Sequence, residues 1–172
     1  SRCCVRNILP LLCVKLTRTH SIAIDHSYKV SAIVSVSGTI ATAISNRMPE
    51  TNVDVMHIHG TSDDVVTYDG ANFSLDPFGS FNIGLSAEQT VEYWRSFNGC
   101  IETPRSCVYN DTKDDGFTFE RYDYSGGNAR VAFINVINGE HDWYASSEQY
   151  DIGYAEEIMK FFTGQMPTNV GI

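Results

Sequence analysis

No stretch of the 172-residue sequence is apolar over the length of a membrane-spanning helix, and basic residues are scarce. The 12 lysines and arginines are outnumbered by 21 aspartates and glutamates, which leaves a net charge of −9 and a pI near 4.8. An anionic surface disfavours nucleic acid and anionic lipid, so we expect neither a nucleic-acid nor a membrane partner. A hydrophobic content of 42% with only 19% charged residues indicates one globular domain.

The five cysteines include no C-x-x-C pair, so a zinc ribbon is not expected. Three lie near the start of the chain, whereas Cys100 and Cys107 flank a short loop that contains Pro104. A Cys100–Cys107 disulfide is expected if the compartment is oxidising, and two free thiols are the alternative.

The sequence also lacks the pattern G-x-S-x-G, in which a serine nucleophile stands on a tight turn between a strand and a helix. Residues 1–25 differ from the rest: they hold three of the cysteines and no acidic residue before Asp25. We interpret residues 1–25 as an atypical amino-terminal segment and residues 26–172 as the main portion of the domain.

Two apolar segments are each followed by residues able to do chemistry. The run 53–59 alternates with the period of a strand, ends at Gly60 and leads into Asp63 and Asp64. The run 130–137 is also strand-like and leads to His141. In open α/β sheets, functional groups collect at the carboxyl ends of strands. An acid and a histidine there make two thirds of a Ser-His-Asp arrangement.

The remaining pattern predicts an α/β fold. Strands are expected at 31–37, 53–59 and 130–137, mostly parallel, with a flanking strand at 117–124 that pairs with 130–137 as a hairpin. One helix is expected at 86–98, where Ser86 and Gln89 form a capping box and Gly99 ends the helix. A second helix is expected at 151–163, with a buried stripe of Ala155, Ile158, Met159 and Phe162.

Four segments carry a family resemblance: SAIVSVSG (31–38), HIHGTSDDVVTYDG (57–70), VEYWRSFNGC (91–100) and NGEHDWYA (138–145). In this order they resemble motifs of the α/β-hydrolases related to polyhydroxybutyrate depolymerases and feruloyl esterases, the LpqC-like group. The likeness extends from about His26 to Phe162. The sequence departs from the family pattern at Asp64, Thr67, Glu140 and Tyr144.

The resemblance implies a partial α/β-hydrolase fold: the carboxyl-terminal part, without the early strands, the oxyanion-hole loop and the nucleophile elbow. It implies a serine-type carboxylic ester hydrolase acting on a polyester such as polyhydroxybutyrate, or on feruloyl or acetyl esters of plant polysaccharide. No cofactor is implied. Such a protein is expected outside the cytoplasm, in the extracellular space or the periplasm.

Within that resemblance, His141 is the expected general base and Asp63 the acid that orients it, with Asp64 as the neighbouring alternative. Trp143 and Tyr68 are candidates for substrate binding, or for packing. The elbow would fall near Cys13, a thiol without flanking glycines, whereas Ser37 belongs to the strand that follows the elbow.

Two other functions are compatible with the sequence. The chain could be a catalytically inactive fragment, or a module that acts only together with a missing amino-terminal piece, because no nucleophile is recognisable. It could instead bind a metal ion through His57, His59 and Asp63, since alternate residues of a strand project to the same side.

Overall fold

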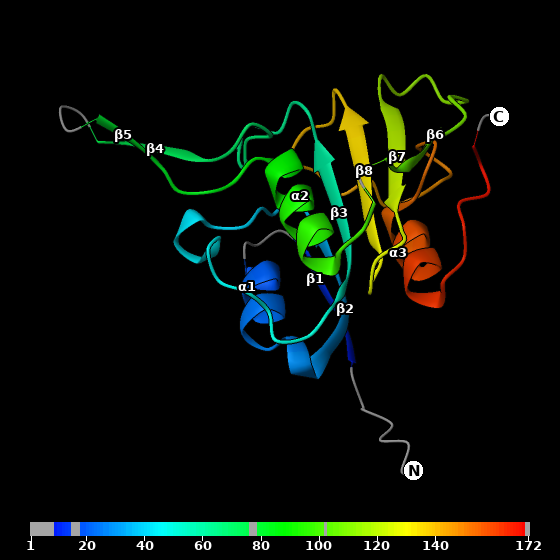
Figure 1. Ribbon diagram of the computed structural model, residues 1–172. Coiled ribbons are helices and arrows are strands. Elements are labelled where there is room, and N and C mark those ends of the chain that lie inside the picture. The colour runs from blue at the N-terminus through cyan, green and yellow to red at the C-terminus, as the bar shows by residue number, and fades with distance from the viewer. Residues whose placement is uncertain (1–8, 15–17, 76–78, 102, 171–172) are drawn as a thin grey trace, which may run out of the picture.

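The computed structural model describes residues 9–14, 18–75, 79–101 and 103–170, which form an α/β fold around a mixed six-stranded sheet (Figure 1). Four strands are parallel: β1 (Leu9–Val14), β2 (Val30–Val36), β3 (Asp54–Gly60) and β8 (Val131–Ile137). Beyond β8, the strand β7 (Thr118–Tyr124) runs antiparallel to β8, and β6 (Arg105–Val108) runs antiparallel to β7. The sheet order is β1-β2-β3-β8-β7-β6, so the sheet is only partly parallel.

Helices cover the sheet from both sides. The helices α1 (Arg18–Asp25) and α2 (Ala87–Asn98) contribute to one core cluster, and α3 (Tyr154–Thr163) contributes to the other. Two single turns, η1 (Ser27–Lys29) and η2 (Thr42–Ile44), join these elements. A separate hairpin of β4 (Asn72–Leu75) and β5 (Gly79–Asn82) extends away from the sheet (Figure 1).

All four predicted strands are present, each displaced by one residue or less at its ends. The hairpin of β7 and β8 is confirmed by its antiparallel register. The inner strands β2 and β3 are buried almost throughout, which explains their nearly continuous apolar runs. Their carboxyl ends meet at one edge of the sheet, and this edge carries the candidate site.

The helix α2 begins and ends as predicted. Ser86 accepts a hydrogen bond from the Gln89 backbone N–H, and the Gln89 side chain accepts from the Ser86 backbone N–H. Gly99 closes the helix with φ of 69°, a left-handed conformation that glycine adopts without steric cost. Trp94 lies fully buried on the inner face of the helix.

The helix α3 differs from its prediction in its start and in its buried face. It begins at Tyr154, and its buried residues are Tyr154, Glu157, Ile158 and Phe161. Met159, predicted to be buried, is 59% exposed. The face is rotated because Glu157 points inward, where its Oε2 accepts hydrogen bonds from Arg121 at 3.0 Å and from Tyr109 at 2.5 Å.

The amino-terminal segment contributes to the sheet as far as the structure describes it. The strand β1 runs parallel to β2 at the sheet edge, and α1 follows and contacts both strands. No helix in the described part of the chain is long and apolar enough to cross a membrane.

The expected Cys100–Cys107 disulfide is not formed, since both thiols are free. Cys100 belongs to the core cluster on the α1 and α2 side, where its Sγ contacts the Ala129 carbonyl at 3.2 Å. Cys107 is paired directly with Arg121, whose guanidinium contacts α3 on the other side of the sheet. The two side chains are therefore directed to opposite faces, which prevents a bond between them.

Candidate active site

Two loops at the carboxyl edge of the sheet are held together by their backbones. The strand β3 ends at Gly60, and the loop after β8 contains Gly139. The Ser62 N–H donates to the Gly139 carbonyl at 2.8 Å, and the Thr61 N–H donates to the Val136 carbonyl at 2.9 Å. A Cβ on Gly60 would lie 2.2 Å from the Gly139 oxygen, so only glycine permits this approach. The close approach brings the residues that follow each strand within reach of one another.

The carboxylate of Asp63 is fixed inside the first loop. Asp63 is 4% exposed, and its Oδ1 accepts hydrogen bonds from the backbone N–H groups of Val65 at 3.0 Å and Val66 at 2.8 Å. These two donors satisfy a buried charge that would otherwise be costly to desolvate. Asp64, the sequence alternative, is exposed to solvent. Of the two neighbouring carboxylates, only that of Asp63 is buried within the loop.

Asp63 contacts His141 directly, which confirms the predicted pair. The Nδ1 atom of His141 lies 2.9 Å from Oδ2 and 3.1 Å from Oδ1 of Asp63. The His141 side chain is 16% exposed, whereas that of Asp63 is fully buried. With its Nδ1–H donated to the carboxylate, the neutral imidazole of His141 carries its lone pair on Nε2, the tautomer of a general base.

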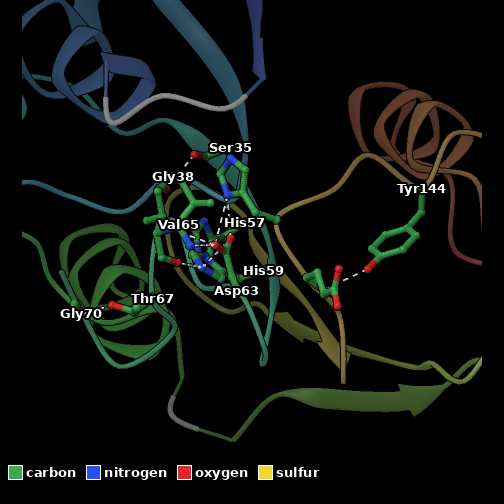
Figure 2. A network of polar contacts seen from close by, with 12 residues as sticks. Ser35, Gly38, His57, His59, Asp63, Val65, Thr67, Gly70 and Tyr144 are labelled. Atoms are coloured by element: carbon green, nitrogen blue, oxygen red, sulfur yellow. Dashed lines mark hydrogen bonds and ion pairs between the residues drawn. The ribbon is translucent and has the colours of Figure 1, made fainter.

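Two buried histidines, His57 and His59, lie beside Asp63 (Figure 2). The Nε2 of His59 lies 2.7 Å from the Val66 carbonyl, so it carries the proton and donates. The Nδ1 of His59 then accepts from Nε2 of His57 at 3.2 Å. Burial lowers the pKa of both histidines, which keeps the rings neutral. By binding the Val66 carbonyl, His59 holds the turn whose N–H groups fix Asp63.

These contacts bear on the metal-binding alternative. His57 and His59 do lie on the same side of β3, but three of their four ring nitrogens bond to each other and to the Val66 carbonyl. The fourth, Nδ1 of His57, is buried without a hydrogen-bond partner among the described residues. In the part of the chain that the structure describes, no group of three or more histidine, cysteine, aspartate or glutamate side chains is placed to hold a metal ion. In the structure, His59 instead bonds within the loop and His57 packs below it.

The two predicted substrate-binding residues lie on opposite faces of the sheet. Tyr68 packs its ring edge against His59, with 5.9 Å between ring centroids, and lines a pocket of about 520 Å³ beside α2. Trp143 packs against Tyr154 of α3, with 5.4 Å between ring centroids. Their roles in substrate binding stay predictions.

His20 is a buried residue of this region that the sequence did not mark. Its Nδ1 accepts from the Trp94 indole N–H at 3.0 Å, and its Nε2 donates to the Gly38 carbonyl at 2.9 Å. Burial lowers the pKa of His20 to about 4. Its ring lies 5.9 Å from that of His57, so α1 is linked to the histidines of β3. In the sequence, the one sign that His20 faces inward is its spacing of three and four residues from Ala23 and Ile24, which are buried on the same face of α1.

The structure describes Cys13, the candidate nucleophile, only in part, and it describes Ser37, which the sequence did not favour as a nucleophile, in full. Cys13 belongs to β1, but its side chain lies outside the described residues. Ser37 follows β2, is buried and has φ of 50°, a strained conformation for a residue other than glycine. The connection from β1 to α1, residues 15–17, is also outside the described part.

No known protein family matches the sequence, and no curated protein matches it either.

Proposed function

We propose that this chain is the carboxyl-terminal part of an α/β-hydrolase related to polyhydroxybutyrate depolymerases and feruloyl esterases, and that its chemistry is the hydrolysis of a carboxylic ester. The observation that carries the proposal is the 2.9 Å contact between His141 Nδ1 and Asp63 Oδ2 at the carboxyl edge of parallel strands. His141 acts as general base, and Asp63 orients its ring.

The order of the elements supports this proposal. In α/β-hydrolases the nucleophile stands on a strand-to-helix turn, and the acid and the histidine follow later in the chain. Here β1 leads into α1, Asp63 follows β3 and His141 follows β8. These strands are parallel, so all three connections leave the sheet at the same edge.

In the proposed reaction, Nε2 of His141 takes the proton of a hydroxyl nucleophile as that oxygen attacks the ester carbonyl. Asp63 stabilises the imidazolium without taking the proton itself. The imidazolium then protonates the departing alcohol, and a water molecule activated in the same way releases the acid. The polyester and the feruloyl or acetyl ester remain the proposed substrates, and no cofactor takes part.

The absence of G-x-S-x-G favours a second candidate, a catalytically inactive chain. Without an activated hydroxyl or thiol, the Asp63–His141 pair lacks its covalent step. Without oxyanion donors, each worth roughly 10²–10³ in rate, a pair of this kind gives little turnover. Cys13 is the thiol that the sequence places near the expected elbow.

The first experiment measures the hydrolysis of short p-nitrophenyl esters by the chain and by its Cys13→Ala and His141→Ala variants. His26→Ala serves as the matched control, because His26 is exposed and lies outside the site. We expect turnover far below that of an ordinary enzyme. Turnover at an ordinary rate that both site substitutions abolish would make Cys13 the nucleophile.

The second experiment introduces a serine nucleophile. The substitutions Val14→Gly, Leu16→Ser and Arg18→Gly create the pattern G-x-S-x-G between β1 and α1. We expect this variant to hydrolyse p-nitrophenyl esters and to react with a fluorophosphonate probe at position 16. Both activities should require His141 and be indifferent to His26. Neither labelling nor hydrolysis in a folded variant would leave the inactive chain as the better interpretation.

A further inference from the structure

A pocket of about 520 Å³ lies between α2 and the side of β7 and β8 that faces this helix. Neither His141 nor Asp63 lines it, although Tyr68, a candidate for substrate binding, does. Tyr68, Tyr122, Tyr124 and Phe133 contribute aromatic rings to its wall, and none of its lining residues is basic. This combination of aromatic surface and missing positive charge restricts what the pocket can bind.

The aromatic rings are held in place from behind. Tyr122 stacks on Phe133 with 6.2 Å between ring centroids and 25° between ring planes. Tyr68 rests its edge against His59. Burial raises the pKa of Tyr68, and it raises the pKa of Tyr122 to about 12, so both phenols stay neutral at ordinary pH. Neutral rings present electron-rich faces that attract cations.

The charged groups around the pocket are carboxylates. Glu92 is neutralised by Arg95 at 2.6 Å, but Glu88 forms no ion pair with any residue that the structure describes. Among the described residues, Glu88 accepts one long contact, of 3.4 Å, from the Tyr68 hydroxyl. Behind the wall, Glu120 accepts from the Tyr122 hydroxyl at 2.9 Å. The pocket therefore has an uncompensated negative potential, which repels anions.

Asn135 adds a hydrogen-bond acceptor at the wall. Its Nδ2 donates to Glu120 at 3.3 Å, whereas its Oδ1 is buried and has no hydrogen-bond partner among the described residues. An unpaired buried acceptor costs free energy that a ligand donor would recover. An N–H group supplies such a donor together with positive charge.

We propose that this pocket binds an organic cation that carries a primary ammonium group. The ammonium lies against the tyrosine faces and is balanced by the Glu88 carboxylate. A rotation of the Asn135 amide then brings its buried Oδ1 to the cavity wall, where it accepts from the ammonium. A carboxylate or phosphate ligand would face the same carboxylate without a positive partner. The proposal is independent of the proposed ester hydrolysis.

The test titrates the full chain with n-butylammonium chloride at constant ionic strength and follows tyrosine ring and Asn135 amide signals by NMR. Butanol is the neutral analogue, butyrate the anionic one, and methyl β-D-xyloside represents a sugar. We expect saturable shifts with n-butylammonium, and binding by butanol weaker by about tenfold or more, a difference of about 1.4 kcal/mol. Butyrate should give no saturable shift.

Two variants assign the binding to this pocket. Glu88→Gln removes the carboxylate charge, and Tyr122→Leu removes an aromatic face while the site stays apolar. Each should weaken n-butylammonium binding by roughly three- to tenfold. Glu50→Gln, which removes an exposed charge outside the pocket, should leave it unchanged. Equal binding of butanol, tighter binding of the xyloside, indifference to both pocket variants, or no saturable shift would overturn the proposal.

Discussion

Asp63 and His141 are 78 residues apart in the sequence, yet Oδ2 of one lies 2.9 Å from Nδ1 of the other. The contact depends on two glycines, because the loops that carry these residues approach each other at Gly60 and Gly139. The same carboxylate accepts two backbone N–H groups of its own turn. The turn fixes the Asp63 carboxylate, and the carboxylate in turn fixes the ring of His141. A general base requires a ring held in this way.

The substitution Asp63→Asn tests whether the Asp63 carboxylate fixes the ring of His141. Asparagine keeps an oxygen for the turn, but its amide NH₂ cannot accept the His141 Nδ1–H, so the imidazole loses its fixed tautomer. We expect a loss of about 1–3 kcal/mol in the free energy of unfolding. The hydrogen-bonded Nδ1 proton of His141 should vanish from the NMR spectrum. Asp64→Asn, one residue further on and exposed, should leave the proton in place; the reverse result would assign the pairing to Asp64.

Buried neutral histidines predict a loss of stability in acid. The pKa of His20 falls from its ordinary value of 6.5 to about 4 in the folded chain. Between these values the unfolded state binds the proton and the folded state does not. The stability is therefore complete above pH 6.5 and declines as the pH falls toward 4, by about 3 kcal/mol for this one group.

The variant His20→Gln isolates that contribution. Glutamine can accept from the Trp94 indole and donate to the Gly38 carbonyl without titrating. The difference in unfolding free energy between the original chain and the variant, measured by urea denaturation, should shrink steadily from pH 7 to pH 4. The exposed His26→Gln should show no such trend. Parallel curves for the original chain and His20→Gln would mean that His20 does not titrate abnormally.

The substitution Gly60→Ala should disrupt both the fold and the site. Its Cβ would meet the Gly139 carbonyl oxygen at 2.2 Å, which is backbone and cannot rotate away. We expect a destabilisation of more than about 4 kcal/mol, measured by thermal or urea unfolding. Gly99→Ala is the control: its Cβ meets nothing within 4 Å, and it should cost only about 1–2 kcal/mol for a left-handed residue. Comparable losses in the two variants would contradict the close approach.

For the buried ion pair of Arg121 and Glu157, we expect that replacing one residue destabilises the fold more than replacing both residues suggests. Both side chains are 2% exposed, and their contact measures 3.0 Å. Arg121→Met leaves the buried Glu157 carboxylate with the Lys160 ammonium at 2.7 Å and the Tyr109 hydroxyl, so we expect a loss of about 1–3 kcal/mol. Replacing both residues with apolar ones should cost less than the sum of the single changes. Arg47→Met, which breaks an exposed pair with Asp25, should cost about 1 kcal/mol or less.

Much of the fold follows from local sequence pattern. The strands β2, β3, β7 and β8 match their predicted positions because each is an apolar or alternating run bounded by turn residues. The helix α2 matches because a capping box and a terminal glycine are local signals. The pairing of Asp63 with His141 was predictable because both follow parallel strands, whose carboxyl ends share one edge.

The inward face of α3, the separation of Cys100 from Cys107 and the burial of His20 were decided by tertiary structure. Each depends on partners distant in the sequence: Arg121 for Glu157, the two faces of the sheet for the thiols, and Trp94 for His20. A polar residue becomes tolerable in a core only when such a partner meets its hydrogen bonds, so its own neighbours in the sequence carry no sign of it. Apolar periodicity determines which segments are buried, whereas three-dimensional packing determines which polar side chains join them.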